Sequence, residues 1–243
     1  MSKRGLKAAA IYGIKPHLLG FCGPREKSST RAVLKYLKGK KISSKKIRKI
    51  LKRFEGAYAY YKLIARCNKI KDPFAENVVK AYWIGNNFLE KVSTRALKEM
   101  IINEFSKPDL LSKNMVIKKA KEIPPGLKPH HSFHVLVIGS VTGRVKLQGK
   151  LLDLCRIGWG KVIELDPLKD RVKVRYLPLI IRKGYRLGKP RKKYINWNKI
   201  ALPSLRVGQY ISFHWNQLAE ILSEADHRSL KRYTLRTLKL IKK

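Results

Sequence analysis

The spacing of apolar residues changes near residue 129, and this change constrains the fold more than any other feature. Before it, apolar side chains recur every three or four residues, which is the period of an amphipathic helix. After it, short apolar runs and alternating segments are bounded by Gly and Pro, as in strands and turns. Two consecutive prolines, Pro124 and Pro125, separate the halves because they cannot continue a helix.

We therefore predict an α+β fold with a helical N-terminal half, a small β-barrel or bent antiparallel sheet in the C-terminal half, and closing C-terminal helices. The corresponding regions are a helical part at 1–128, a β-rich part at 129–214 and helices that pack back at 215–243. These regions are also compatible with one integrated domain, because the chain length suits either one large domain or two modest ones.

Particular elements are predicted within the first half. The dense Gly and Pro residues of 8–24 predict a shaped loop around Cys22, after at most a short helical turn. One helix of about five turns is predicted from the caps Ser43 and Ser44 to Ala65, because its apolar residues keep a helical period.

In the second half, short apolar or alternating runs predict strands at 133–138, 151–157 and 171–177. In the last of these, basic residues alternate with apolar ones, which gives the strand one core face and one cationic face. The range 215–222 is predicted to be helical, and Asp226 is predicted to cap a final helix.

The charge balance is strongly basic: 56 Lys and Arg residues stand against 16 Asp and Glu residues, which gives a formal net charge of +40. Such an excess attracts polyanions, so RNA or another nucleic acid is the expected partner. The alternative is a lysine-rich proteome, as in a thermophilic or AT-rich organism, in which the charge has no function. Acidic residues would rise with lysine in that case, and here they do not.

Cysteine use and hydropathy indicate the compartment. Three widely separated cysteines argue against a disulfide framework and for a reducing environment. The chain has no apolar run long enough to span a membrane and no signal-peptide pattern. We therefore expect a cytoplasmic protein without a transmembrane segment.

Basic clusters at 25–53, 171–199 and 228–243 are candidate phosphate-binding surfaces. Tyrosines are interleaved with the second cluster, and exposed rings suit base stacking. The alternative is that the rings belong to the core and the charges form a solvated face. The predicted nucleic-acid-binding residues are Lys45, Lys46, Lys49, Arg53, Arg171, Lys173, Arg175, Arg182, Lys183, Tyr185, Arg191, Lys192, Lys193 and Tyr194.

Three of the six histidines, His130, His131 and His134, lie within five residues of one another. With the thiolate of Cys155 or Cys22 they could form a zinc, nickel or iron site. A strand advances roughly 3.3 Å per residue, so in a strand His130 and His134 would lie about 13 Å apart and would not share a metal. The alternative is that the histidines cap the strand and form hydrogen bonds with a neighbouring loop.

Enzymatic motifs are missing: the sequence has no Walker loop, no G-x-G-x-x-G and no G-x-S-x-G. No catalytic residue is therefore predicted, and Glu55 is interpreted as the partner of a lysine rather than as a proton acceptor. An enzyme that acts on an anionic small molecule is a third hypothesis. It predicts a concave pocket where Cys22, Glu55 and the histidines converge.

Several short motifs spread over nearly the whole chain carry a resemblance. They are Gly-Phe-Cys-Gly-Pro (20–24), Phe-Glu-Gly-Ala-Tyr (54–58), Ala-Tyr-Trp-Ile-Gly-Asn (81–86), His-His-Ser-Phe-His-Val (130–135), Cys-Arg-Ile-Gly-Trp-Gly (155–160) and Ser-Phe-His-Trp (212–215). The chain resembles an uncharacterised prokaryotic domain-of-unknown-function family with no established activity. The resemblance is consistent with a metal-related accessory role, linked to nickel–iron hydrogenase maturation.

Overall fold

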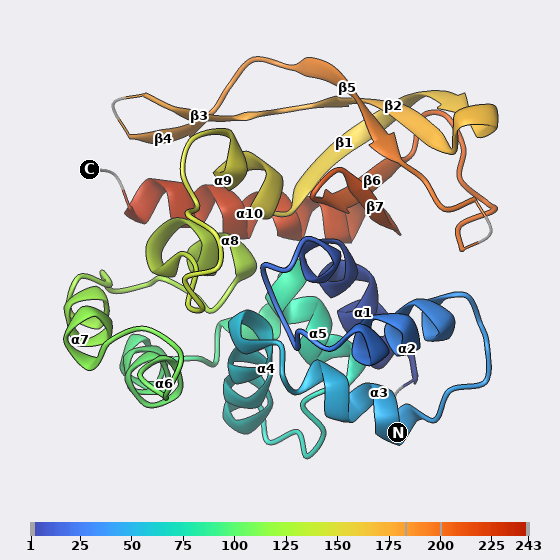
Figure 1. The fold of residues 1–243 in the computed structure, drawn as a ribbon. Helices are drawn as coiled ribbons and strands as arrows, with labels where there is room; N and C mark the ends of the chain where they lie inside the picture. The colour runs from blue at the N-terminus through green and yellow to red at the C-terminus, as the bar shows by residue number, and fades with distance from the viewer. Residues whose placement is uncertain (1–2, 183, 200, 242–243) are drawn as a thin grey trace.

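The computed structural model describes residues 3–182, 184–199 and 201–241, and it confirms the α+β class. The N-terminal helices pack below a layer of strands, and the last helix runs along the boundary between them (Figure 1). The helices are α1 (Lys3–Leu18), α2 (Lys27–Leu37), α3 (Ser44–Leu51), α4 (Glu55–Cys67), α5 (Glu76–Trp83), η1 (Asn87–Leu89), α6 (Thr94–Phe105), α7 (Lys113–Lys121), α8 (His131–Phe133), η2 (His134–Ile138), α9 (Lys150–Cys155), η3 (Pro167–Lys169) and α10 (Glu224–Leu240). The strands are β1 (Gly158–Asp166), β2 (Arg171–Tyr176), β3 (Leu179–Ile181), β4 (Tyr185–Leu187), β5 (Arg191–Asn196), β6 (Tyr210–His214) and β7 (Gln217–Leu222).

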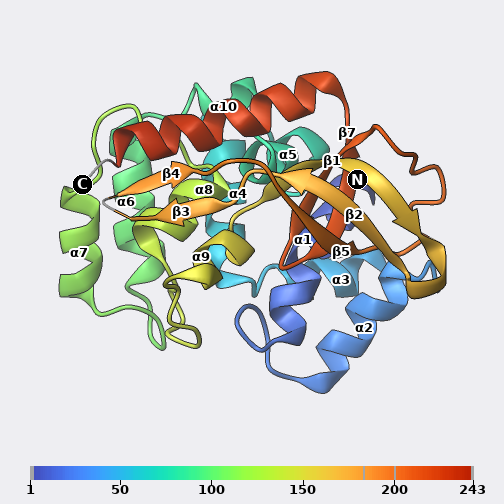
Figure 2. The same cartoon turned by 90° about the horizontal axis from the view of Figure 1, so that it is seen from above.

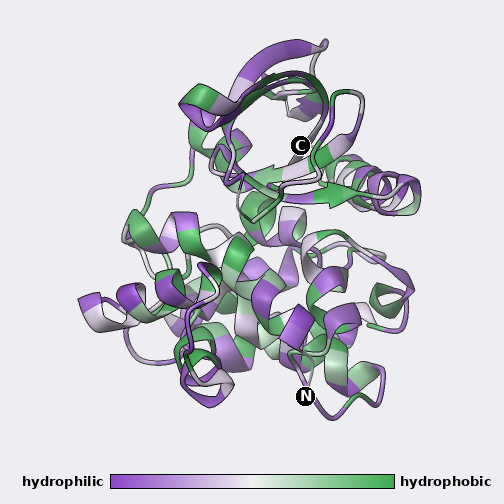
Figure 3. Cartoon of the chain, turned by 90° about the vertical axis from the view of Figure 1, so that its right-hand side faces the viewer, coloured by the Kyte–Doolittle hydropathy of each residue, from purple (hydrophilic) through white to green (hydrophobic). Residues whose placement is uncertain are grey.

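Five of these strands close a barrel in the order β1-β2-β5-β7-β6, and β3 and β4 form a separate hairpin. Neighbours pair antiparallel except β5 and β7, which meet in parallel at Asn196 and Gln217. Viewed from the side in Figure 3, the strands curve into a ring above the helices. The predicted alternation of β2 is confirmed, because Val172 and Val174 are buried in the barrel while the basic residues between them are more exposed.

Helix α1 is central to the helical half and also connects it to the barrel. It packs against α2, α3 and α5, and it contacts β6 and β7. Small residues allow this close packing: a Cβ atom at Gly13 would lie 2.8 Å from the ring of Phe54. On the other side, α10 contacts α8, β6 and β7, and Figure 2 shows it lying alongside the barrel and the β3–β4 hairpin.

The strand predicted at 133–138 is wrong. The segment forms the helical turn α8 followed by the π-helical turn η2. A short apolar run is ambiguous between a buried strand and a buried helix, and here the run is enclosed by the helical half and α10. The strand predicted at 151–157 is wrong for the same reason, since α9 occupies most of it and β1 begins only at Gly158.

Three further local predictions are corrected. The single long helix is two helices, because the chain turns at 52–54 and Phe54 becomes the N-cap residue of α4. The loop predicted at 8–24 begins only after α1 ends at Leu18, with Pro16 inside the last helical turn. The predicted helix at 215–222 is instead strand β7, which pairs with β6, so a single helix closes the chain.

None of the described helices is long and apolar enough to cross a lipid bilayer.

Candidate metal centre

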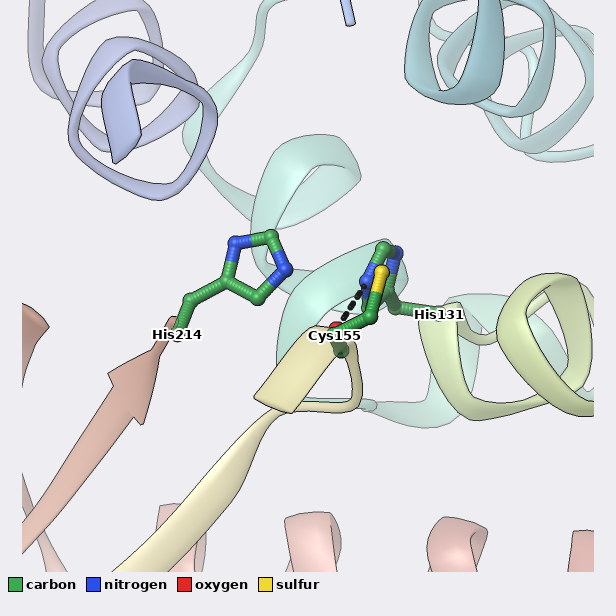
Figure 4. Close-up of side chains that lie close together, drawn as sticks. All are labelled: His131, Cys155 and His214. Carbon is green, nitrogen blue, oxygen red and sulfur yellow. Dashed lines mark hydrogen bonds between the residues drawn. The ribbon is translucent and has the colours of Figure 1, made fainter. Parts of the chain in front are cut away.

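Three side chains from distant parts of the chain meet where the helical half joins the barrel (Figure 4). They are His131 on α8, Cys155 at the end of α9 and His214 at the end of β6. One ring nitrogen of each histidine and the thiol sulfur lie within 4.8 Å of one another, and all three residues are buried. Bond lengths to zinc imply separations of about 3.4–3.6 Å between nitrogen and sulfur ligands. The three side chains are therefore near one another, and an ion would have to draw their ligand atoms closer together.

His214 presents a free lone pair to this cluster. Its Nδ1 lies 2.7 Å from the backbone oxygen of Tyr12, so Nδ1 carries the proton and donates it. Its buried Nε2 lies near the Cys155 backbone but forms no hydrogen bond of normal geometry with the residues that the structure describes. Burial lowers the pKa of His214 to about 4, so the ring is neutral near pH 7. Histidines that bind metals usually donate their other N–H group to a carbonyl or carboxylate in this way.

The hydrogen bonds of His131 form a chain that lacks one proton. Nδ1 lies 2.9 Å from the Tyr82 hydroxyl, which lies 2.5 Å from the Gly56 carbonyl, and Nε2 lies 2.9 Å from the Cys155 carbonyl. A neutral imidazole and a phenol supply two protons for these three contacts. If Tyr82 donates to Gly56 and Nδ1 donates to Tyr82, the lone pair of Nε2 faces a carbonyl oxygen. The other tautomer, with the proton on Nε2, donates to the Cys155 carbonyl, so a metal could bind Nε2 only after that carbonyl moves away.

The cluster carries no net charge in its metal-free state. Burial lowers the pKa of His131 well below its ordinary value, and His214 and His134 lower it further. Burial also raises the pKa of the Cys155 thiol, with Cys22 adding to the effect. A bound cation would reverse the second shift, because the thiolate is the form that binds metals. Two neutral imidazoles and a thiol are therefore suited to a transition-metal cation rather than to an anion.

A cavity of about 40 Å³ adjoins the cluster. Of the five residues predicted from the sequence for a metal site, all except His130 line this cavity, and they are joined there by His214. A space of this size holds a few water-sized molecules at most, since one water needs roughly 10–15 Å³. Cys22 and His134 therefore line the same cavity as the three-residue cluster. Their ligand atoms do not belong to the set that lies within 4.8 Å of one another.

His134 and His130 have different surroundings. The Nδ1 of His134 lies 3.1 Å from the Tyr60 hydroxyl, and Gly56 makes room for its ring, because a Cβ atom there would lie 2.8 Å from Nε2. His130 instead caps α8: its Nδ1 accepts from the Ser132 N–H at 3.3 Å, and its ring stacks on Tyr233 of α10. Burial lowers the pKa of both histidines to about 3.

Glu55 organises the loop that carries Cys22. Its carboxylate accepts a hydrogen bond of 3.0 Å from the Gly23 N–H and lies 3.4 Å from Arg144, which also donates to the Gly23 carbonyl at 2.7 Å. Its cationic partner is therefore Arg144 and not a lysine. Burial raises the pKa of Cys22 to about 12, and the charge of Glu55 acts in the same direction. Cys22 is consequently a neutral thiol at pH 7.

The residues predicted to bind nucleic acid are placed on two separate surfaces. Figure 1 shows α3 low in the helical half and β2 and β5 at the top of the barrel. Several of these cations have acidic partners: Arg53 pairs with Glu26 at 2.6 Å, and Lys173 pairs with Glu164 at 2.8 Å.

The remaining predicted residues differ in exposure. Tyr194 is 38% exposed, and the Arg171 guanidinium lies 4.0 Å from the centre of its ring. Burial lowers the pKa of Lys193 to about 8. Tyr185 is half-buried in the β3–β4 hairpin. The exposed cations without an ion pair to a described acid are Lys45, Lys46, Lys49, Arg175, Arg182, Arg191 and Lys192, while Lys183 lies outside the described residues.

His214 is the site residue that sequence reasoning missed. The sequence contains one signal for it, the motif Ser-Phe-His-Trp at 212–215, but the residue lies far along the chain from His131 and Cys155. Only the closed barrel, in which β6 pairs with β1 directly after α9, brings these positions together.

The model of a family of unknown function (DUF6390) matches residues 1–243. No curated protein and no solved structure matched the chain.

Proposed function

Because the chain belongs to DUF6390, a family of unknown function whose membership assigns no activity, we propose a function from the geometry alone. The proposal is that this is a metal-binding protein that holds one transition-metal ion on His131, Cys155 and His214. Zinc, nickel and iron all suit two imidazoles and a thiolate.

The observation that carries the proposal is the unpartnered Nε2 of His214. A buried nitrogen lone pair without a partner costs free energy, about 1–3 kcal/mol for a typical polar group, unless a ligand uses it. This lone pair belongs to the cluster in which a second imidazole and a thiol lie within 4.8 Å. Its opposite ring nitrogen is already fixed on the Tyr12 carbonyl, so the ring is oriented before a metal arrives.

The small cavity limits what such an ion could do. Three protein ligands leave one position open on a tetrahedral ion, and about 40 Å³ leaves room for a water-sized ligand there. A large substrate does not fit beside the ion. The arrangement therefore favours retention of a metal, for structure or for an accessory role, over turnover of a bulky substrate.

Metal analysis of the purified full chain tests this proposal. After loading with zinc and removal of free metal, we expect about one ion per chain for a single centre. Cys155→Ser and His214→Ala should lose the bound ion, whereas Cys67→Ser and His227→Ala should retain it, because Cys67 and His227 lie outside the cluster. Circular dichroism establishes that each variant is folded.

A cobalt-substituted sample provides a second readout that does not depend on affinity alone. Thiolate ligation gives a charge-transfer band in the near ultraviolet, and this band should vanish in Cys155→Ser but persist in Cys67→Ser. Substoichiometric metal after loading, or identical spectra for these two serine variants, would refute the proposal.

We also propose nucleic-acid binding as a second function, on the separate ground of the charge of +40 and the exposed cations of α3 and β5. Phosphate contacts release counterions, so binding to mixed RNA should weaken steeply with salt. The proposal fails if the chain does not bind RNA at low salt, or if its affinity does not depend on salt.

A further inference from the structure

We propose that a second cleft, on the outer side of the Cys22 loop, binds a small molecule that carries phosphate groups. This arginine cleft has a volume of about 770 Å³ and is lined by five basic side chains: His17, Arg25, Lys27, Arg31 and Arg144. Its volume lies in the range of small-ligand pockets, roughly 300–1,000 Å³. The proposal goes beyond metal binding and does not depend on it.

The charges of the arginine cleft are of one sign. No carboxylate lines it. Among the residues that the structure describes, Arg144 pairs with Glu55, but no acidic side chain lies within ion-pair distance of Arg25, Lys27 or Arg31. Like charges held around one depression repel each other and raise the local concentration of anions. The cleft is therefore prepared for an anion with more than one negative charge.

The residue types favour phosphate over a simple carboxylate. A guanidinium presents a planar fork of N–H donors that matches two oxygens of a phosphate group. One arginine is enough to bind a carboxylate in this way, whereas this cleft presents Arg25, Arg31 and Arg144 together with Lys27. Several forks around one volume are better matched to a diphosphate, which offers more oxygens and more charge.

The wall of the cleft is held in place by hydrogen bonds. His17 on α1 lies 3.0 Å through Nδ1 from the Cys22 carbonyl and 2.9 Å through Nε2 from the Thr30 hydroxyl on α2. Across the loop, Arg144 donates to the Gly23 carbonyl and Glu55 accepts from the Gly23 N–H. A wall that is fixed before binding loses little conformational entropy when a ligand arrives. The loop backbone and Arg144 are thus fixed before a ligand binds, while Arg25, Lys27 and Arg31 are exposed side chains on this fixed frame.

Isothermal titration of the metal-free full chain with pyrophosphate tests the proposal at roughly physiological ionic strength, where distant surface charges are screened. We expect saturable binding at one site. The double variant Arg25→Gln and Arg31→Gln should weaken binding at least about tenfold, the loss expected when charge-assisted hydrogen bonds are removed. The matched double variant Arg66→Gln and Arg95→Gln removes the same charge elsewhere and should change the affinity less than about twofold.

A lysine version, Arg25→Lys with Arg31→Lys, separates geometry from charge. It keeps the charge but loses the forks, so its affinity should fall between those of the wild type and the glutamine variant. Cys155→Ser should bind pyrophosphate as the wild type does, which keeps this result independent of the metal centre.

Further ligands distinguish the source of the phosphate. Inorganic phosphate and ADP should compete with pyrophosphate for the same site. Absence of saturable pyrophosphate binding, equal weakening in the two glutamine variants, or binding of RNA without binding of the small phosphates would each overturn the proposal.

Discussion

The candidate metal centre and the arginine cleft are both lined by Cys22, yet their chemistry is opposite. The centre is a cavity of about 40 Å³ with neutral imidazoles and neutral thiols, while the cleft measures about 770 Å³ and is lined by cations. Burial keeps the groups of the small cavity uncharged, whereas solvent in the open cleft stabilises the charges of its basic side chains. The difference shows that a strongly basic chain can still build an interior cluster of neutral imidazoles and thiols.

The same comparison shows that the net charge of this protein does not describe its interior. The formal charge of +40 describes the surface, where most Lys and Arg side chains are exposed. At the candidate metal centre burial keeps the imidazoles and the thiol neutral, so the surface charge does not describe the local chemistry.

The largest effect is expected from Tyr82→Phe. This change removes the hydroxyl that lies between Nδ1 of His131 and the Gly56 carbonyl. Without it, a proton on Nδ1 has no acceptor, so the tautomer with the proton on Nε2, which cannot bind a metal through Nε2, becomes favoured. Loss of such an outer partner typically lowers metal affinity about 10–100-fold, which competition with a chelator of known affinity can measure.

Tyr61→Phe is the matched control for that experiment. The Tyr61 hydroxyl is equally buried but accepts from the Trp83 indole at 2.5 Å and touches no ligand of the centre. Pyrophosphate binding should be unchanged in both variants. An equal loss of metal affinity in the two variants would mean that general packing, and not the His131 hydrogen bond, decides the affinity.

The fold was predictable where periodicity and local rules agree. In β2, alternation placed Val172 and Val174 inside the barrel because the side-chain period of a strand admits one such arrangement. At 133–138 the apolar residues have no period that distinguishes a strand from a helix. The segment is helical because it packs against α10 and the helical half, and these long-range contacts cannot be deduced from the local sequence. The break at Phe54 has a similar origin, since its ring fits beside Gly13 and Gly23.

The candidate site was predictable only in part, for a related reason. His131, His134, Cys155 and Cys22 were predicted from residue chemistry, and they line one cavity although the strand geometry assumed for two of them is wrong. His214 lies on a segment that is recognisable as a barrel strand, but its place in the site required knowledge that β6 pairs with β1, the strand that follows α9. That pairing is a long-range property of the fold, and a single sequence has no pattern that specifies it.

A smaller effect, on stability, is expected from Glu220→Gln. Burial raises the pKa of Glu220, whose carboxylate accepts a hydrogen bond from the Tyr12 hydroxyl. An acid with a raised pKa holds its proton in the folded state, so wild-type stability falls as pH rises from about 4.3 through the raised value. Glutamine keeps an acceptor but has no such loss.

Thermal unfolding between pH 4 and pH 9 measures this difference. The melting temperature of Glu220→Gln relative to the wild type should increase with pH, by about 2–4 °C if the variant gains about 1 kcal/mol. Glu99→Gln, on the exposed face of α6, should show no such trend. A melting-temperature difference that is constant over this range would show that the interior tolerates the ionised carboxylate, which would weaken the contrast with the cleft.

The smallest effect concerns Glu55→Gln, which acts on the outer side. The variant keeps an acceptor for the Gly23 N–H but removes the negative charge that lies 3.4 Å from Arg144. Arg144 then adds an uncompensated charge to the arginine cleft, and pyrophosphate should bind about two- to threefold more tightly, the scale of one partly screened charge. Isothermal titration resolves a change of this size, and Glu99→Gln again controls for net charge.

Metal affinity should stay constant, because Glu55 does not line the inner cavity. Weaker pyrophosphate binding in Glu55→Gln would contradict this prediction. It would show that the ion pair between Glu55 and Arg144 holds the loop in place, and that the position of the Gly23 backbone affects binding more than the added charge on Arg144 does.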